Sequence, residues 1–196
     1  MLDEGYIKFN CVWENQPLNV NVPIELITWR NKLYDLGLIG HYKDLDVGYG
    51  NISIKIPEGI LISGTQTGEI SQIQPQHFTL VDRYDIALNT VWCKGPVKAS
   101  SETMTHAAIY ECNPEIKAVI HIHNLKLWKK YFEKLPTSDK KVPYGTPEMA
   151  YEIIRLYNET GLSKKKILIM GGHKEGIIAF GNNLEEAGNL ILSLLK

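Results

Sequence analysis

The stretch "AVIHIHN", residues 118–124, places His121 and His123 on either side of one apolar residue, at the end of a run typical of a buried strand. In an extended strand, residues i and i+2 project from the same face about 7 Å apart. The two imidazole rings can therefore reach one point in space. The pair by itself is a modest signal for a metal site, because strand histidines are often ordinary core or surface residues.

A third histidine strengthens the metal interpretation. "ILIMGGH", residues 167–173, ends an apolar run on His173, and the two glycines before it permit a close backbone approach and an abrupt turn. Three neutral imidazoles from two strands, with further coordination positions open, are the layout of a catalytic zinc site. The same ligands also accept manganese, iron or cobalt.

An acidic residue follows two serines in "KASSETMTH", residues 98–106. Ser100 or Ser101 is predicted to cap a helix, which places Glu102 in its first turn, where the helix dipole favours a carboxylate. Such a turn binds phosphate, and a carboxylate there can ligate a metal or move a proton. His106 lies one turn later on the same helix face and could orient Glu102. A simple helix cap remains the alternative for these residues.

Two glycine-containing turns have the composition of anion-binding loops. "GYGNIS" at 48–53 and "SGTQTGEI" at 63–70 are rich in small polar residues and glycine, whose N–H groups can converge on an oxyanion. Neither is a Walker or Rossmann fingerprint. Each, taken alone, also fits an ordinary hairpin turn.

Strands and helices mix along the chain without strict βαβ alternation, and hairpins are present. This pattern predicts a single α/β domain over residues 1–196, with a largely antiparallel or mixed sheet between helices. The predicted strands are 4–14, a hairpin over 50–64, 78–82, 86–93, 115–123, 164–173 and 175–181. The predicted helices are a first helix from Pro23 to Gly37 or Gly40, then 100–112, 126–141, 147–160 and 182–195.

Three helices carry more detailed expectations. The apolar face of the first helix is predicted to contain Ile24, Ile27, Leu33 and Leu36. The lysine-rich segment 126–141 has Trp128, Tyr131, Phe132 and Leu135 at helical spacing, which favours an amphipathic helix over a basic binding patch. The expected caps are Thr146 with Pro147 for the fourth helix, and Asn182 with Glu185 as a capping box for the last.

Composition excludes several classes of protein. The 196 residues are 44% hydrophobic and 22% charged, a balance typical of globular proteins, and the net charge of −1 provides no field for binding nucleic acid. No targeting segment and no apolar run of about 20 residues is present, so we expect a cytoplasmic protein that does not interact with membranes. The three cysteines are far apart, which indicates neither a disulfide framework nor a thiolate zinc site.

Seven motifs, taken in order, resemble the class II aldolase/adducin family, in particular the zinc-dependent fuculose-phosphate aldolase group. They are "GNIS", "LISGTQTG", "LVD", "KASSE" with a later histidine, "AVIHIH", "PYGTPEMA" and "GGHKEGIIAFG", and they run from about Gly48 to the end of the chain. The resemblance implies a three-layer α/β/α fold around a mostly antiparallel sheet. It also implies a homo-oligomer, usually a homotetramer.

The resemblance also assigns roles to residues. It implies that His121, His123 and His173 bind zinc, one ion per chain, and that Glu102 is the catalytic acid/base and can also touch the metal. The implied phosphate-binding residues are Gly50, Asn51, Thr67, Gly68, Ser100 and Ser101. The implied reaction is cleavage or formation of a ketose 1-phosphate, with dihydroxyacetone phosphate and an aldehyde as the fragments and a metal-stabilised enediolate between them.

The sequence departs from the family pattern near the third histidine. The family commonly has Asn-His-Gly there, whereas "GGHKEG" inserts Lys174 and Glu175 before the next glycine. This charged pair could reshape the substrate pocket, or Glu175 could become an extra ligand that lowers activity. Tyr131 or Tyr144 could supply the tyrosine that some relatives bring over the site. The alternatives left open are a pentulose-phosphate 4-epimerase, a thio-sugar-phosphate dehydratase, and a non-catalytic adducin-like binding module.

Overall fold

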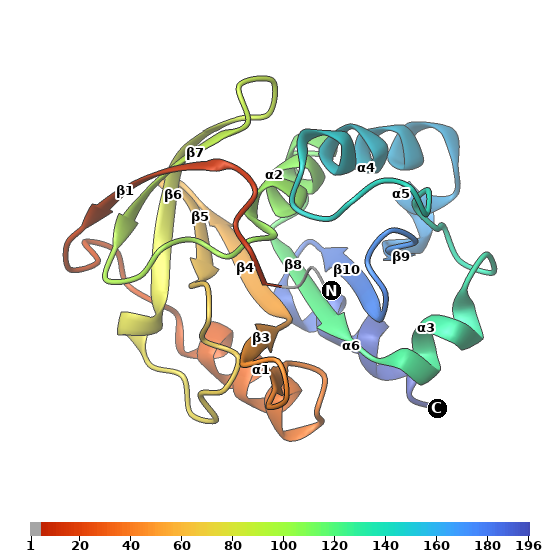
Figure 1. Cartoon of the computed structure of the whole chain (residues 1–196), viewed down its shortest axis with the longest axis horizontal. Helices are drawn as coiled ribbons and strands as arrows, with labels where there is room; N and C mark the ends of the chain where they lie inside the picture. The colour runs from red at the N-terminus through yellow and green to blue at the C-terminus, as the bar shows by residue number, and fades with distance from the viewer. Residues whose placement is uncertain (1–4) are drawn as a thin grey trace.

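A computed structural model describes residues 5–196, and its centre is one twisted sheet of eight strands with helices on both sides (Figure 1). The strands are β1 (Asn10–Asn15), β2 (Gly40–Tyr42), β3 (Val47–Tyr49), β4 (Asn51–Ile56), β5 (Gly59–Ser63), β6 (Phe78–Asp85), β7 (Thr90–Gly95), β8 (Ala118–His123), β9 (Ile167–Ile169) and β10 (Gly176–Gly181). The helices are α1 (Ile24–Asp35), the short 3-10 helix η1 (Pro75–His77), α2 (Thr103–Cys112), α3 (Leu125–Tyr131), α4 (Pro147–Glu159), α5 (Leu162–Lys165) and α6 (Leu184–Leu194).

The strand order in the large sheet is β1-β7-β6-β5-β4-β8-β10-β9, and β2 and β3 form a separate two-stranded sheet. The β1–β7 pair is parallel, and the other pairs in the large sheet are antiparallel. Strand β8 lies between β4 and β10, so both of its edges are hydrogen-bonded. The predicted mixed, mostly antiparallel sheet is confirmed.

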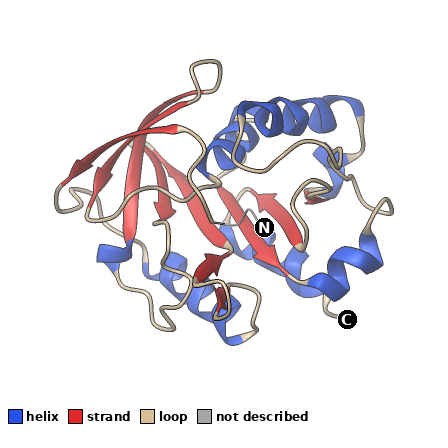
Figure 2. Ribbon diagram, viewed as in Figure 1, coloured by secondary structure: helices blue, strands red, loops and turns tan. Residues whose placement is uncertain are grey.

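The sheet separates two hydrophobic cores, which gives the molecule three layers (Figure 2). One core packs under α2 and α4, and the other under α1 and α6. Strand β8 contributes Val119 to the first core, and Ile120 and Ile122 to the second. Because side chains alternate along a strand, His121 and His123 share the face of Val119 and point toward the α2 layer. The strand alternation predicted from the sequence therefore fixes which layer holds the histidines.

Several element boundaries differ from the sequence prediction. The strand expected over 86–93 starts at Thr90, because residues 86–89 form the turn that joins β6 to β7. The strand expected over 164–173 is only β9, since α5 precedes it and Lys166 adopts a left-handed conformation with φ +54°. The first strand, expected over 4–14, begins at Asn10; residue 4 lies outside the described residues. The hairpin expected over 50–64 is confirmed as β4 and β5.

Two helices also differ from the sequence prediction. The predicted apolar face of α1 was partly right: Leu33 is buried and Ile27 packs against the second core, but Ile24 is 76% exposed. The other buried residues of α1 are Leu26 and Arg30. The lysine-rich helix ends at Tyr131 rather than continuing to 141, because Glu133 adopts a left-handed conformation and Pro136 follows. The apolar residues of the segment 126–141 nevertheless pack against the second core, as expected: Trp128, Tyr131, Phe132 and Leu135.

The predicted caps were partly right. Thr146 accepts a hydrogen bond from the Met149 N–H at the start of α4, as expected. The cap of α6 is shifted by one residue, so Asn183 accepts from the Glu186 N–H, and the Glu186 carboxylate accepts from the Asn182 N–H. Within residues 5–196, no helix is both long and apolar enough to span a bilayer.

Candidate metal and anion site

Three buried histidines meet at one end of the central strands. His121 and His123 end β8, and His173 lies in the turn between β9 and β10. Their relative exposures are 1%, 3% and 4%, and one ring nitrogen from each lies within 4.8 Å of the others. The structure therefore brings together the three histidines that the sequence marked as metal ligands.

The two glycines before His173 permit a close backbone crossing, as the sequence predicted. A Cβ atom on Gly171 would lie 2.0 Å from the Ser138 carbonyl oxygen, and one on Gly172 would lie 1.8 Å from that of Val142. Any side chain at either position would collide with backbone. The loop that follows α3 therefore crosses directly over the turn that carries His173.

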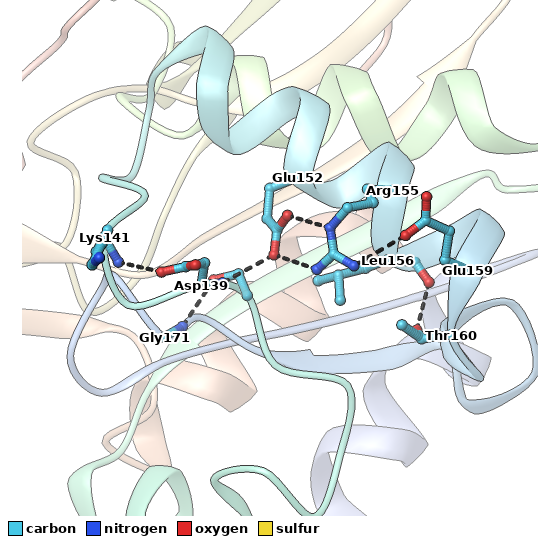
Figure 3. A network of polar contacts seen from close by, with 9 residues as sticks. Asp139, Lys141, Glu152, Arg155, Leu156, Glu159, Thr160 and Gly171 are labelled. Carbon is cyan, nitrogen blue, oxygen red and sulfur yellow. Dashed lines mark hydrogen bonds and ion pairs between the residues drawn. The ribbon is translucent and has the colours of Figure 1, made fainter.

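A polar network anchors this crossing loop to α4 (Figure 3). Arg155 makes a bidentate ion pair with Glu152, with N–O distances of 2.7 and 2.8 Å, and Glu152 accepts a hydrogen bond from the Asp139 N–H. The Gly171 N–H donates to the Ser138 hydroxyl at 2.9 Å. Bidentate, charge-assisted contacts are stronger than neutral ones, so they hold the loop in place.

Three tyrosines surround the histidines, and only one of them was anticipated. Tyr144, on the crossing loop, stacks on His173 with ring centroids 4.3 Å apart. Tyr49 stacks on His123 at 5.4 Å, and the Tyr42 hydroxyl lies 3.0 Å from Nδ1 of His123. Tyr131, the other candidate from the sequence, packs instead against the core under α1 and α6.

Glu102 lies against the histidine cluster at the start of α2, where it is 1% exposed. Its Oε1 lies 3.0 Å from Nδ1 of His173, and its Oε2 accepts a hydrogen bond from the Thr105 hydroxyl at 2.7 Å. The predicted capping role for the serines was wrong in detail: Glu102 itself occupies the N-cap position of α2. Thr105, rather than the expected His106, holds the carboxylate, because His106 is hydrogen-bonded to Ser53 at 2.7 Å.

The electrostatics favour the protonation states that a metal site requires. Burial lowers the pKa of His121 to about 3, and it lowers that of His123 well below its usual value. Burial alone would raise the pKa of Glu102, but the hydrogen bond with His173, the electrostatic effect of His121 and His173 and the Thr105 hydroxyl outweigh it and lower this pKa to about 2. At neutral pH His121 and His123 are therefore neutral, and Glu102 is a carboxylate.

The donor set fits a transition metal such as zinc. Each ring has its Nδ1 beside a protein group: the Asn51 amide at 3.3 Å for His121, the Tyr42 hydroxyl at 3.0 Å for His123 and the Glu102 carboxylate at 3.0 Å for His173. Metal-binding histidines generally use their second nitrogen in this way. For His121, Nε2 is buried and makes no hydrogen bond within the described part of the chain. Three imidazole nitrogens that can converge on one ion are donors that zinc prefers.

A polar pocket adjoins the cluster and contains every residue that the sequence marked for phosphate binding. It is lined by turns after β3 and β5, by the segment before α2, and by Glu102 and His121. The marked residues that line it are Gly50, Asn51, Thr67, Gly68, Ser100 and Ser101. Gly50 has φ +74°, a left-handed conformation that a side chain disfavours. The pocket and the histidine cluster thus share His121, and Glu102, which also lines the pocket, contacts His173 of the cluster.

A buried arginine that the sequence analysis missed supports one wall of this pocket. Arg30 in α1 is 1% exposed, and its guanidinium donates hydrogen bonds to the carbonyl oxygens of Thr67 at 2.6 Å and Gly68 at 3.3 Å, and to that of Ile70. Burial lowers its pKa to about 10, so it stays charged at neutral pH. The only signal in the sequence is an arginine at helical spacing between Leu26 and Leu33.

Comparison with known proteins identifies the family. The family model "Class II Aldolase and Adducin N-terminal domain" matches residues 31–196. The 3-oxo-tetronate 4-phosphate decarboxylase of Escherichia coli K12 is 37% identical over 158 residues, which cover 71% of this chain and 69% of the relative. The L-fuculose phosphate aldolase of Haemophilus influenzae is 29% identical over 157 residues, with 70% and 65% covered. The chain belongs to the class II aldolase/adducin family.

A solved structure agrees with the fold. The L-fuculose-1-phosphate aldolase of Thermus thermophilus superimposes with a TM-score of 0.65 at 19% sequence identity, and 87% of each chain is covered. At this identity the likeness concerns the architecture alone. The expected family fold, with helices on both sides of a large mixed sheet, is thereby confirmed.

Proposed function

We propose that this protein is a metal-dependent carbon–carbon lyase. It cleaves a ketose 1-phosphate into dihydroxyacetone phosphate and an aldehyde, or joins these two compounds in the reverse reaction. One observation carries the proposal: Glu102 and His121 line the same pocket as the glycine- and serine-rich turns. An acid/base, a metal-ligand cluster and an anion-binding surface are thus within reach of one small phosphorylated substrate.

Different residues have different roles in the proposed reaction. The metal, when bound by His121, His123 and His173, supplies Lewis acidity to the substrate carbonyl. The turns and Ser100 and Ser101 bind the phosphate, which contributes binding energy remote from the bond that breaks.

Glu102 moves the proton at the reacting carbon. As a carboxylate it removes a proton from the carbon next to the carbonyl in the condensation direction. In cleavage, the hydroxyl that becomes the aldehyde oxygen loses its proton, and the electron pair of the broken carbon–carbon bond stays on the carbonyl fragment as an enediolate. Glu102 takes up this proton and delivers it to the enediolate carbon.

A second reaction, decarboxylation, is favoured by the 37% identity to a 3-oxo-tetronate 4-phosphate decarboxylase. In a 3-oxo acid the carboxylate is attached to the carbon next to the carbonyl. Loss of CO₂ from 3-oxo-tetronate 4-phosphate therefore leaves the same enediolate as aldol cleavage, and its protonation gives dihydroxyacetone phosphate. The two reactions differ only in the group that leaves.

The proposal extends to the cofactor and the assembly. We propose zinc as the resident metal, with manganese, iron or cobalt as substitutes, because the ligands are three imidazoles. We also propose a homo-oligomer, a tetramer by analogy with the family. Light scattering on the metal-loaded protein measures the assembly, and a monomer would contradict this part of the proposal.

A product assay tests the reaction. The zinc-loaded protein is given fuculose 1-phosphate or 3-oxo-tetronate 4-phosphate, and dihydroxyacetone phosphate is measured by coupled reduction, with the aldehyde and CO₂ measured in parallel. Release with an aldehyde supports the aldolase, and release with CO₂ supports the decarboxylase. Glu102→Gln, loaded with the same metal, is the matched control.

Other products would identify the remaining alternatives. A pentulose phosphate inverted at C4 without fragment release would indicate the epimerase, and loss of water from a thio-sugar phosphate would indicate the dehydratase. A protein that binds no metal and turns over none of these substrates would be an adducin-like binding module.

A further inference from the structure

The Tyr42 hydroxyl bridges a histidine and a carboxylate that are far apart in the sequence. It donates a hydrogen bond to Oε2 of Glu175 at 2.9 Å and lies 3.0 Å from Nδ1 of His123. A hydroxyl has one proton, and here Glu175 accepts it. The contact with His123 must therefore be a hydrogen bond from the imidazole Nδ1–H to the tyrosine oxygen. A neutral imidazole with its proton on Nδ1 carries its lone pair on Nε2.

We propose that Tyr42 and Glu175 are positioning residues that hold His123 in the tautomer and orientation in which Nε2 binds the metal. This inference rests on the metal site of the proposed function. It assigns a role to Glu175 different from the one expected from the sequence, because this carboxylate contacts the hydroxyl of Tyr42 and is not part of the three-histidine cluster.

The backbone at Glu175 supports a specific role for its side chain. Glu175 has φ +76°, a conformation that costs free energy in any residue other than glycine. Two backbone hydrogen bonds hold the turn, from the Gly176 N–H to the His173 carbonyl and from the Asn124 N–H to the Glu175 carbonyl, both at 3.0 Å. Glycine would be the less strained choice here, but it would lack the carboxylate that orients Tyr42.

The bridge is built from three separate parts of the fold. Tyr42 ends β2, His123 ends β8, and Glu175 lies in the turn before β10. Tyr42 also packs against Tyr49, with ring centroids 4.4 Å apart, so the hydroxyl is directed by packing as well as by hydrogen bonds. Neither Tyr42 nor Glu175 is among the described residues that line the polar pocket. Their effect should therefore fall on the metal rather than on the substrate phosphate.

Zinc affinity, measured by competition with a chromophoric chelator, tests the inference without any substrate. Tyr42→Phe should weaken zinc binding about 10- to 100-fold, the usual cost of losing an outer partner of a metal-binding histidine. Glu175→Gly should also weaken zinc binding, while the metal-free protein becomes no less stable, because glycine accepts the positive φ. The double variant should bind zinc no more weakly than Tyr42→Phe, since Glu175 acts through Tyr42.

Two matched controls accompany these variants. Tyr49→Phe removes the hydroxyl of a ring that stacks on His123 but donates to the Gly37 carbonyl. Lys174→Gly changes the same turn at an exposed side chain. Both should keep zinc affinity within about twofold of wild type, given the usual size of surface effects.

A second measurement is independent of the metal. Nitrogen-15 NMR of the histidine rings in the metal-free protein should find the His123 proton on Nδ1, and Tyr42→Phe should produce a mixture of tautomers. Wild-type zinc affinity in Tyr42→Phe, or a proton on Nε2 of His123 in the wild type, would overturn the inference and leave the proposed function standing. A wild-type protein that binds no zinc would overturn both.

Discussion

The histidine cluster and the polar pocket share His121 and are linked by Glu102, yet they are built in different ways. The cluster consists of two side chains at the end of β8 and one in the turn between β9 and β10, and each Nδ1 has a protein group beside it. The pocket is lined mainly by residues of turns, and one buried arginine holds part of its wall through the carbonyls of Thr67 and Gly68. Single substitutions should therefore have a large effect in the cluster, where each side chain is a proposed ligand, and a gradual effect in the pocket, which many residues line.

The largest effect should come from the cluster. His121→Ala removes one of the three proposed ligands. Loss of a residue that only orients a ligand lowers metal affinity up to about 100-fold, so we expect loss of a ligand to lower zinc affinity further and to abolish turnover. Metal content per chain, measured by mass spectrometry, checks this. His77→Ala, at a histidine outside the cluster, should retain its zinc. An unchanged metal content in His121→Ala would remove this histidine from the ligand set.

Glu102→Gln should separate chemistry from metal binding. The amide keeps the shape of the side chain but cannot exchange a proton, so kcat should fall by about 10²- to 10⁴-fold. Metal content should remain close to one ion per chain, because Glu102 is not part of the three-histidine cluster. Steady-state kinetics on the zinc-loaded variant check this. A fully active variant would mean that Glu102 is not the acid/base.

Arg30→Met should disturb the pocket without touching the cluster. The substitution leaves the carbonyls of Thr67, Gly68 and Ile70 without their charged donor, so we expect a loss of about 3 kcal/mol in the free energy of unfolding. KM for the phosphorylated substrate should rise, while zinc affinity stays unchanged. Urea unfolding and chelator competition measure these two quantities. A matching loss of zinc affinity would show that the two regions are not independent.

The pocket serines should give a graded response. Ser100→Ala combined with Ser101→Ala removes two hydroxyls but leaves the backbone N–H groups, so binding of a phosphorylated sugar should weaken about 10-fold, the cost of one lost hydrogen bond to a charged group. Binding of the dephosphorylated sugar should not change. Isothermal titration of both compounds checks the difference, and equal losses would argue against a phosphate-binding role.

The smallest expected effect per residue is the pH dependence of the free energy of unfolding of the metal-free protein. Burial lowers the pKa of His106 to about 4 and that of His121 to about 3, from a usual 6.5. The unfolded chain therefore binds more protons below pH 6.5, and the free energy of unfolding should fall by roughly 1 kcal/mol per buried histidine for each pH unit below that value. Unfolding curves between pH 7.5 and about 5 measure this. A flat profile would mean that these rings do not stay neutral.

Much of the cluster could be predicted because the signals were local. The alternation in β8 places His121 and His123 on one face, and the two glycines before His173 mark the backbone crossing. Arg30 was missed because its partners lie about 40 residues away along the chain, and hydropathy alone assigned the face of α1 only in part. An arginine is buried only where charge or hydrogen bonds compensate it, and its spacing does not reveal them.

The sequence by itself determined the fold class, the three imidazoles and Glu102, because strand alternation and helix starts depend on near neighbours. Only the tertiary structure decided which protein group holds each imidazole. Asn51 lies 70 residues from His121, Tyr42 lies 81 residues from His123, and Glu175 lies 133 residues from Tyr42. Such contacts depend on how strands and turns meet in space, and no periodicity along the chain records where they meet.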